Sequence, residues 1–347
     1  MSTIEIVLTN DYEIFGDGRS DIRFCLIEPT DRLLEIAGKY NIPITIMAEV
    51  CEYWAFKNEE LKETLPRGYR PASWIEEQLI NCVQNKHDVQ LHIHPQWINY
   101  SFDLNTYNWK VGSNYCKVSS LSYEEIYELL RRGKQELEDL LKPNREGYEC
   151  FVFRAGAWSI QPEEQVLKAL INVGFRIDTS VASGCCFKSR LINYDFKETP
   201  HKLYWFIKES IKEETTAGIL ELPIYSRKYF IHDKIYYKFL RRKKRVPKDY
   251  KDVINFNARE LFFKRLLPKY VMFDFCAMSA VEIIDILKYA ERKFRNQDFI
   301  PVIAIGHSKT FNNARDFDSF IKKALNRGYN FTTFRDLLNK INDGSTV

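Results

Sequence analysis

The chain has 347 residues, of which 45% are hydrophobic and 28% are charged, a composition typical of a soluble globular protein. The length allows one large domain or two ordinary ones. A formal net charge of +4 is too small to indicate a nucleic acid partner, and no apolar run approaches the length of a transmembrane helix.

The cellular compartment is predicted from two features of the sequence. The N-terminus shows no basic segment followed by an apolar core, so no secretory signal is visible. The eight cysteines are scattered, without a Cys-x-x-Cys pair, which favours reduced thiols over a disulfide framework or a zinc ribbon. We therefore expect a cytoplasmic protein.

The first part of the chain alternates between strand and helix patterns. A strand is predicted at residues 4–9, a helix at 31–40, an apolar strand at 44–50 and a helix at 73–84. Three of the six histidines lie within eight residues here: His87 just before the next strand, and His92 and His94 at its end. Its apolar residues alternate with polar ones, so His92 and His94 are expected on one face, and Pro95 is expected to end the strand. Two imidazoles on one face suit a transition-metal site, whereas His87 precedes the strand and more simply caps or packs.

The rest of the chain continues the same alternation. Residues 96–120 are polar and aromatic and suggest a long loop, and a capping box at Ser122 then predicts a long amphipathic helix that ends before Pro143. Strands follow at 150–154, 175–179, 219–224 and 301–306, with helices at 162–173, 280–294 and 317–327. We predict an α/β protein with one domain, residues 1–347, built as a distorted barrel with a mostly parallel sheet, and an insertion at about 231–267.

Polar side chains follow the predicted strands at their carboxyl ends. In parallel α/β folds these ends meet on one rim, where active sites lie. The residues gathered there carry carboxylate, imidazole and guanidinium groups: Asp11, Glu13, His92, His94, Arg154, Asp178 and His307. Such a convergence favours a metal-dependent hydrolase over solvated loop histidines.

These motifs also carry a family resemblance. The series Thr9-Asn10-Asp11, His87 to His92, Phe153-Arg154-Ala155-Gly156, Asp178-Thr179-Ser180 and Ile305-Gly306-His307 resembles the motifs of the polysaccharide deacetylase family, carbohydrate esterase family 4. Within that family it is similar to bacterial members that contain a Gln-Leu-His-Ile-His-Pro string. The resemblance spans about residues 4 to 335. It implies a barrel of parallel strands, a divalent metal, zinc by preference, and hydrolysis of an N-acetyl group on a sugar.

The first family motif has two possible registers here. Aligned on Thr9, Asp11 matches the catalytic base, and Asp11-Tyr12-Glu13 resembles an Asp-Val-Glu variant in which Glu13 is a metal ligand. Aligned one residue earlier, Asp11 would be the metal ligand and Asn10 would stand in for the base. We favour the first register, and Asp11 is essential in both.

The remaining motifs assign the other site residues by resemblance. His92 matches the first metal ligand of His-x-x-x-His, but the fourth position after it is Gln96, so His94 must substitute. Arg154 matches the arginine that orients the catalytic carboxylate. Asp178 matches the acidic residue of the fourth motif. His307 matches the histidine of the last motif, which is expected to be the general acid.

The chemistry of amide hydrolysis requires these residue types. A zinc-like ion polarises the carbonyl and acidifies water. Asp11 can take the proton from water and His307 can protonate the leaving amine. Trp97 and Trp158 could stack on a sugar ring, and Gly156 lies beside Trp158 in the same motif.

Three functional hypotheses follow, and one charged segment adds a separate possibility. The first is a metal-dependent carbohydrate N-deacetylase acting on a sugar precursor or a surface polysaccharide intermediate. The second is a non-catalytic sugar-binding or regulatory relative without the full metal site, which Asn10, Tyr12 and Gln96 motivate. The third is a hydrolase for a non-sugar amide. The basic run at residues 241–245 is more simply a solvated face than a peripheral membrane contact.

Overall fold

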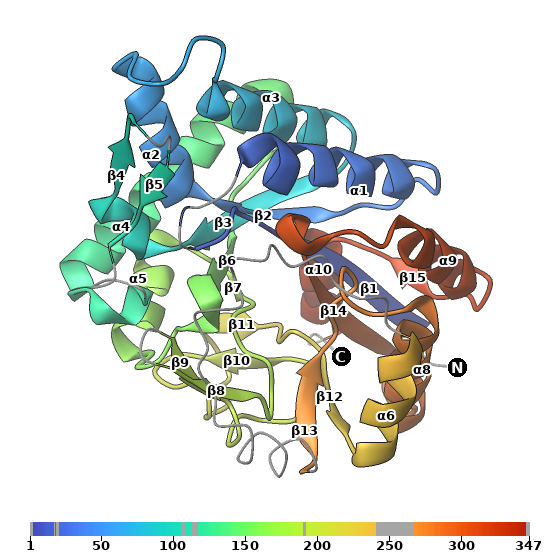
Figure 1. The fold of residues 1–347 in the computed structure, drawn as a ribbon. Coiled ribbons are helices and arrows are strands. Elements are labelled where there is room, and N and C mark those ends of the chain that lie inside the picture. The colour runs from blue at the N-terminus through green and yellow to red at the C-terminus, as the bar shows by residue number, and fades with distance from the viewer. Residues whose placement is uncertain are drawn as a thin grey trace.

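A computed structural model describes residues 3–16, 18, 21–105, 108–112, 117–189, 192–240 and 267–344. Its main sheet has nine strands in the order β10-β11-β7-β6-β3-β2-β1-β14, with β15 also paired to β1 (Figure 1). All neighbouring strands are parallel except β10 and β11. The bounds are β1 Thr3–Tyr12, β2 Thr45–Glu49, β3 Asp88–Ile93, β6 Val152–Ala155, β7 Ile177–Asp178, β10 Trp205–Ile207, β11 Ile219–Glu221, β14 Phe299–His307 and β15 Asn330–Phe331.

The sheet curls because its two sides meet beyond β11. Ile224 forms a parallel bridge with Ile303 of β14, and the Tyr225 N–H donates to the Ile303 carbonyl at 2.9 Å. A second parallel bridge joins Asp274 to Ile305. The predicted fold class, a distorted and mostly parallel barrel, is therefore confirmed.

Helices cover the outside of the curled sheet (Figure 1). They are α1 Glu28–Gly38, α2 Val50–Leu61, α3 Pro71–Gln84, α4 Tyr123–Leu141, α5 Glu164–Val173, α6 Ile231–Leu240, α8 Ala280–Lys293 and α9 Ala314–Leu325. A further helix, α10 Phe334–Gly344, packs instead on the interior side chains of the sheet. The predicted caps at Ser122 of α4 and Ser279 of α8 are present. No helix of the described residues is long and apolar enough to cross a bilayer.

Strand β1 shows how the sequence separates the barrel interior from its outer face. Leu8 belongs to the large core under the helices, whereas Val7 belongs to a second core closed by Phe334 and Leu337 of α10. Since side chains alternate along a strand, residues 5, 7, 9, 11 and 13 face the interior. Val7 is apolar near the amino end, and Asp11 and Glu13 are charged at the carboxyl end. The interior is thus filled with apolar side chains near the amino end of β1 and with polar side chains near its carboxyl end.

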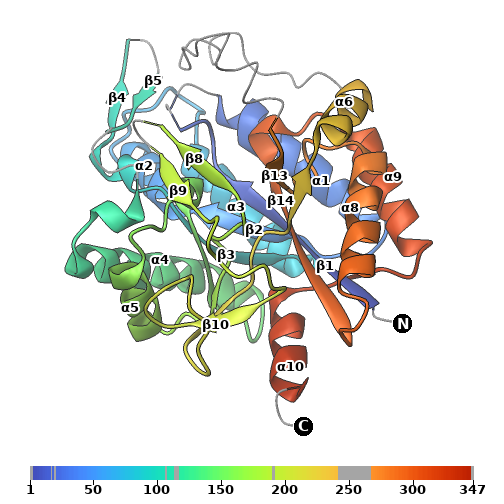
Figure 2. The ribbon, with the colours of Figure 1, turned by 90° about the horizontal axis from the view of Figure 1, so that it is seen from below.

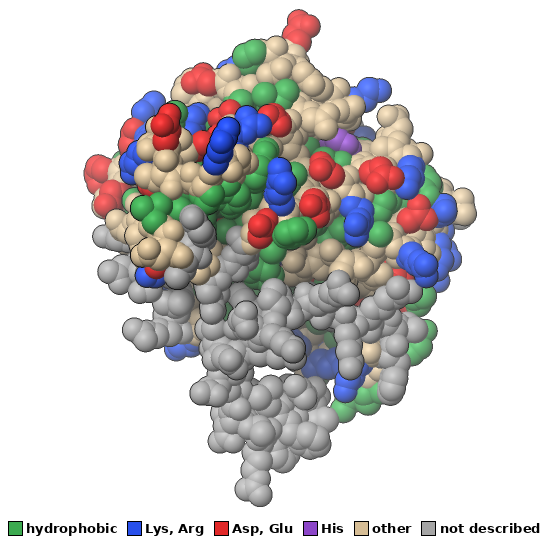
Figure 3. Space-filling model, turned by 45° about the horizontal axis from the view of Figure 1, so that its top comes forward, with side chains coloured by type: hydrophobic (Ala, Val, Ile, Leu, Met, Phe, Trp, Pro, Cys, Tyr) green, Lys and Arg blue, Asp and Glu red, His purple; other side chains and the backbone are tan. Residues whose placement is uncertain are grey.

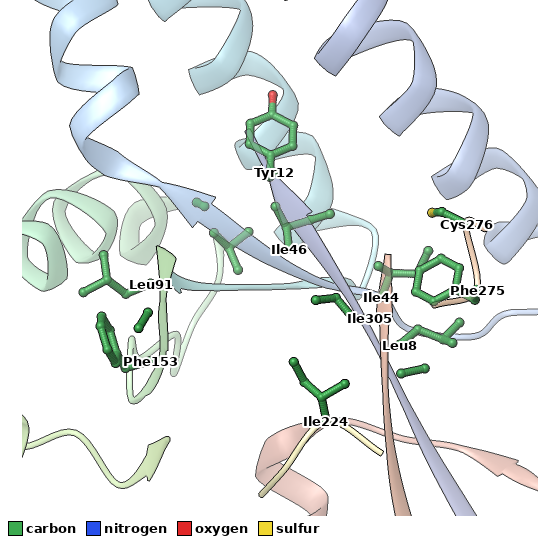
Figure 4. Close-up of a cluster of buried hydrophobic side chains, with 14 of the residues drawn as sticks. Leu8, Tyr12, Ile44, Ile46, Leu91, Phe153, Ile224, Phe275, Cys276 and Ile305 are labelled. Atoms are coloured by element: carbon green, nitrogen blue, oxygen red, sulfur yellow. The ribbon is translucent and has the colours of Figure 1, made fainter. Parts of the chain in front are cut away.

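The outer core is visible in close-up in Figure 4. Leu8, Ile46, Leu91 and Phe153 come from four neighbouring strands and all belong to the cluster under the helices. Helix α10 lies apart from the other helices at the C-terminus (Figure 2). Its Lys340 pairs with the buried Glu5 at the start of β1 at 2.6 Å. The site is consequently built on strands that are packed on both faces.

Several smaller elements interrupt the βα rhythm. The predicted loop at 96–120 contains the short helix η2 Pro95–Asn99, the hairpin β4 Ser101–Asp103 with β5 Asn108–Lys110, and η3 Val118–Ser120. Another hairpin is β8 Cys186–Lys188 with β9 Asn193–Asp195, and β12 Ser226–Tyr229 forms an antiparallel pair with the more distant β13 Lys269–Met272. The predicted insertion begins as helix α6, and residues 241–266, which include the basic run at 241–245, lie outside the described residues.

Charge is mixed over the described part of the face in Figure 3. Lysine and arginine side chains alternate there with aspartate and glutamate, and hydrophobic side chains lie between them. The picture agrees with the small net charge of +4.

Candidate active site

The polar rim predicted from the sequence exists at the carboxyl ends of β1, β3, β6 and β14. Exposure of its side chains rises outward, from 0% at Arg154 and 3% at Asp11 to 9% at Glu13 and 15% at His307. The site is thus a shallow layer above the barrel core, with its ion pair at the bottom.

Three side chains of this rim form a group with metal-binding chemistry. One ligand atom from each of Glu13, His92 and His94 lies within 4.8 Å of the others, and all three residues are buried. Oε2 of Glu13 is 2.5 Å from Nε2 of His94 and 3.6 Å from Nε2 of His92. The predicted alternation in β3 is confirmed, because the two imidazole rings lie on one face with centroids 4.9 Å apart.

The histidines are oriented by contacts at their other ring nitrogens. Nδ1 of His92 lies 2.9 Å from the backbone carbonyl of Arg154, so it donates there and leaves a lone pair on Nε2. The amide nitrogen of Gln96 lies 3.1 Å from Nδ1 of His94 and donates to it, which places the ring proton of a neutral His94 on Nε2. Turning the Gln96 amide by 180°, so that its oxygen faces Nδ1, would give His94 the same tautomer as His92 and leave a lone pair on Nε2. Both Nε2 atoms face Oε2 of Glu13, and neither has another hydrogen-bond partner among the described residues. Two imidazole nitrogens and a carboxylate oxygen fit a zinc-type ion.

Lys309 completes the surroundings of Glu13, and the sequence analysis did not identify it. Its Nζ lies 2.5 Å from Oε1 of Glu13 and 3.2 Å from the Ile14 carbonyl. Burial alone would raise the pKa of Glu13, but His94 and Lys309 outweigh burial and hold that pKa well below its usual value. Glu13 is therefore a carboxylate at neutral pH.

Asp11 lies beside this group but points to different partners. Nη1 of Arg154 donates to Oδ1 of Asp11 at 2.5 Å, and Nε2 of His307 lies 3.6 Å from Oδ2. Burial alone would raise the pKa of Asp11, but Arg154, followed by His92 and His307, lowers it. Burial lowers the pKa of His307, although Asp11 opposes the shift. Asp11 is thus an ionised base candidate between a fixed guanidinium and an imidazole.

The first of the two registers for the β1 motif agrees with this placement. Asn10 and Tyr12 lie on the opposite face of β1, where the Asn10 amide donates to Ser308 at 2.7 Å and the Tyr12 hydroxyl donates to Gln78 at 2.7 Å. Asn10 is therefore not positioned to replace Asp11. The metal-ligand role predicted for Asp11 stays a prediction, since the three-residue group of the described chain does not include it.

Arg154 is held from below by a polar layer. Its Nε donates to the Thr179 carbonyl at 3.1 Å, and its Nη1 also donates to the Thr9 hydroxyl at 2.9 Å. Asp178 and Glu221 are paired in register on β7 and β11, both 0% exposed. Burial raises the pKa of each carboxyl group, that of Glu221 most strongly. Arg154 is near enough to oppose the effect of burial on the pKa of Asp178, and the catalytic role of Asp178 stays a prediction.

Glu49 is a second site residue that the sequence analysis missed. It caps the N-terminus of α2, accepting from the Cys51 and Glu52 N–H groups, and it also accepts from the His94 N–H at 2.8 Å. Burial raises its pKa to about 7. Glutamate is not among the residues preferred at a helix N-cap, so only the fold shows that this carboxylate caps α2 and holds the His94 backbone.

The three predicted substrate-binding residues have different surroundings. Gly156 touches His94: a Cβ there would lie 2.5 Å from the Ile93 carbonyl and 2.7 Å from His94 Cγ. Trp158 is partly buried, with φ of 57°, and its ring meets His307 edge-on at 6.0 Å between centroids. Trp97 is 2% exposed and packs against aromatic rings of the core.

These surroundings support one of the three roles. Trp158 lies at the edge of the site, because its ring stands beside that of His307, and its contact with a substrate stays a prediction. Trp97 has almost no free ring surface, so its placement favours packing over stacking on a sugar. Gly156 acts in the structure by making room for the ring of His94.

Comparisons with known proteins place the fold. No family model and no curated sequence matches the chain. A solved structure described as a polysaccharide deacetylase from Mycobacterium smegmatis is similar over 100% of this chain and 92% of its own, with a TM-score of 0.53 and 12% identity. A branching enzyme of glycoside hydrolase family 57 from Thermococcus kodakaraensis is similar over 97% of this chain and 71% of its own, with a TM-score of 0.50 and 12% identity.

The class that the fold defines is the barrel of the polysaccharide deacetylases, as the resemblance predicted. A carbohydrate-branching enzyme has a similar fold, so the fold alone does not select the reaction. The side chains on the rim must do so.

Proposed function

We propose that this chain is a metal-dependent hydrolase that removes an N-acetyl group from a carbohydrate. The observation that carries the proposal is the placement of Glu13, His92 and His94 beside the Asp11–Arg154 pair, with His307 across from it. A neighbour of similar fold described as a polysaccharide deacetylase supports the substrate class. Zinc is the metal that the donor set favours.

The metal would be held by Glu13, His92 and His94, and when bound it would supply Lewis-acid polarisation of the amide carbonyl. Because Asp11 is ionised, it can accept the proton of an attacking water, and Arg154 keeps the carboxylate fixed at Oδ1. The other oxygen, Oδ2, is free to receive that proton.

The leaving amine needs a proton when the carbon–nitrogen bond breaks. His307 is placed to deliver it, because its Nε2 lies 3.6 Å from Oδ2 of Asp11. The proton taken from water by Asp11 can pass to His307 and then to the amine nitrogen, so that water and amide yield acetic acid and an amine, which separate as acetate and the protonated amine. Trp158, beside His307, would contact the sugar ring.

The decisive experiment combines metal content with product detection. The purified protein should hold about one zinc per chain after supplementation, and His92→Ala should lose it. His232→Ala, at an exposed position, is the matched control and should keep it. The wild type should release acetate from at least one member of a panel of N-acetyl sugars, and Asp11→Asn should not. Absence of metal from the supplemented wild type would refute the proposal, whereas metal without acetate release from any sugar would redirect it to a non-sugar amide.

A second candidate function is a non-catalytic sugar-binding relative. One observation favours it: Oε1 of Glu13 is occupied by Lys309 while Oε2 contacts His94, so the group is electrostatically complete without an ion. This candidate predicts sugar binding in calorimetry with no bound metal and no acetate.

A further inference from the structure

Lys309 is the one cation whose ammonium group touches a member of the Glu13–His92–His94 group in the described residues. It lies in the short helix η7 Ser308–Thr310, directly after β14. Its side chain is 14% exposed and that of Glu13 is 9% exposed, so water screens the pair only weakly. A surface ion pair contributes little, but a buried one fixes the geometry of both partners.

The position of Lys309 is set by its own neighbours. The adjacent Ser308 is fully buried, and its hydroxyl receives a hydrogen bond from Asn10 at 2.7 Å and lies 2.5 Å from the Thr30 hydroxyl. The ammonium group also reaches the Ile14 carbonyl. The contacts of Ser308 anchor the backbone that carries Lys309, and the ammonium group is held at Glu13 together with its hydrogen bond to the Ile14 carbonyl.

The two oxygens of Glu13 consequently face different partners. Oε1 is held by Lys309, and only Oε2 faces the two histidines. A cation entering the group would meet only Oε2 of Glu13. The ammonium group of Lys309 would stand on the other side of the same carboxylate, at Oε1. Like charges at such separations repel strongly at low dielectric.

We propose that Lys309 is a positioning residue that holds Glu13 as a one-oxygen ligand and weakens divalent metal binding at this site. The inference rests on the proposed metal site and adds a determinant of its affinity. In this arrangement the group stays assembled without an ion, because Lys309 neutralises Glu13. The metal is then exchangeable rather than permanently held.

The test compares three metal-free proteins: the wild type, Lys309→Met and Lys309→Arg. Each is titrated with Co²⁺ and with Zn²⁺, and calorimetry measures the affinity. Lys309→Met should bind both ions at least about tenfold more tightly, because the repelling charge is gone. Lys309→Arg keeps the charge and should bind like the wild type. Metal-free Lys309→Met should also melt at a lower temperature, and saturating metal should restore its stability, since Glu13 loses its partner only in the metal-free state.

Lys340→Met is the matched control, because Lys340 also pairs with a buried glutamate, Glu5, but far from the rim. It should melt lower without any change in metal affinity. Equal affinity of wild type and Lys309→Met would overturn the role of Lys309 and leave the metal site standing. Binding by neither protein would overturn both proposals, whereas binding by Lys309→Met alone would support the role of Lys309 and refute metal dependence of the natural chain.

Discussion

Asp11 and Arg154 form an ion pair that is almost wholly out of solvent, with the two side chains 3% and 0% exposed and their charged atoms 2.5 Å apart. The partners lie 143 residues apart in the sequence and meet because β1 and β6 end at the same rim. Each charge is tolerable in this layer only because the other is present.

Removal of Arg154 is therefore expected to be costly. Arg154→Met should lower the free energy of unfolding at neutral pH by about 3–5 kcal/mol, because Asp11 would remain as a buried, uncompensated carboxylate. Chemical denaturation measures the loss. The exposed pair of Arg131 with Glu128 is the comparison, and Arg131→Met should cost less than about 1 kcal/mol.

The effect of Arg154→Met on the free energy of unfolding should also depend on pH. The pKa of Asp11 is lowered in the folded protein, so the pair stabilises the fold above the unfolded pKa of about 3.9 and loses that effect as the pH falls. The difference between wild type and Arg154→Met should thus be largest near neutral pH and shrink in acid. A difference that stayed constant down to pH 3 would mean that Asp11 is not the group left unpaired.

His87 gives a second pH prediction, away from the rim. Its Nδ1 accepts the Ile44 N–H at 3.1 Å, and burial lowers its pKa to about 4. A histidine whose folded pKa lies below its unfolded value of about 6.5 stabilises the fold at neutral pH and loses that effect as the pH falls from 6.5 to 4. Relative to His87→Gln, the wild type should lose about 3 kcal/mol of unfolding free energy over that range.

The measurement is the difference between the two proteins in denaturant unfolding at several pH values, because other buried carboxyl groups titrate in both. Between pH 7 and 8 the difference should be constant. A flat difference across the whole range would show that His87 is not kept neutral by burial.

Gly156 predicts a steric effect on the metal group. Gly156→Ala would push a methyl group into the Ile93 carbonyl and the His94 ring, so it should destabilise the protein by about 1–3 kcal/mol and displace His94. Metal titration should show at least about tenfold weaker binding. At Gly38 a Cβ meets nothing within 4 Å, so Gly38→Ala is the control and should leave metal binding unchanged. Unaltered affinity in Gly156→Ala would mean that the ring of His94 does not hold the ion.

The rim could be predicted from the sequence because its signals are local. Alternation in β3 placed His92 and His94 together, and strand ends located Asp11, Arg154 and His307. These features depend only on the period of a strand and on the parallel arrangement of the sheet.

The missed residues depend on contacts between distant segments. Lys309 meets Glu13 only because η7 folds back over the end of β1, 296 residues away in sequence. Helix α2 was missed because both its faces are partly buried, so it shows no clear polar stripe. Trp97 was assigned to the substrate because an aromatic ring can stack on a sugar, and its packing against Phe56 of that helix and Trp109 could not be seen in the sequence.

Gln96 offers the sharpest test of which residue is the second nitrogen ligand. It occupies the place where the family motif has a histidine, but its amide contacts Nδ1 of His94 and so lies behind that ring. Gln96→Leu should weaken metal binding about 10–100-fold, because His94 would lose the partner that fixes its orientation. Gln96→His should bind nearly as the wild type, since an imidazole can replace the amide as that partner.

The double variant His94→Ala with Gln96→His separates the two geometries. If His94 is the ligand, the double variant should bind metal as poorly as His94→Ala alone. The reason is that the side chain at position 96 comes from η2 and lies at the Nδ1 side of His94, away from Glu13. Recovery of wild-type affinity would instead mean that position 96 can swing into the group, and that the family spacing still governs this site. Cobalt titration of the four variants beside the wild type distinguishes these outcomes without reference to activity.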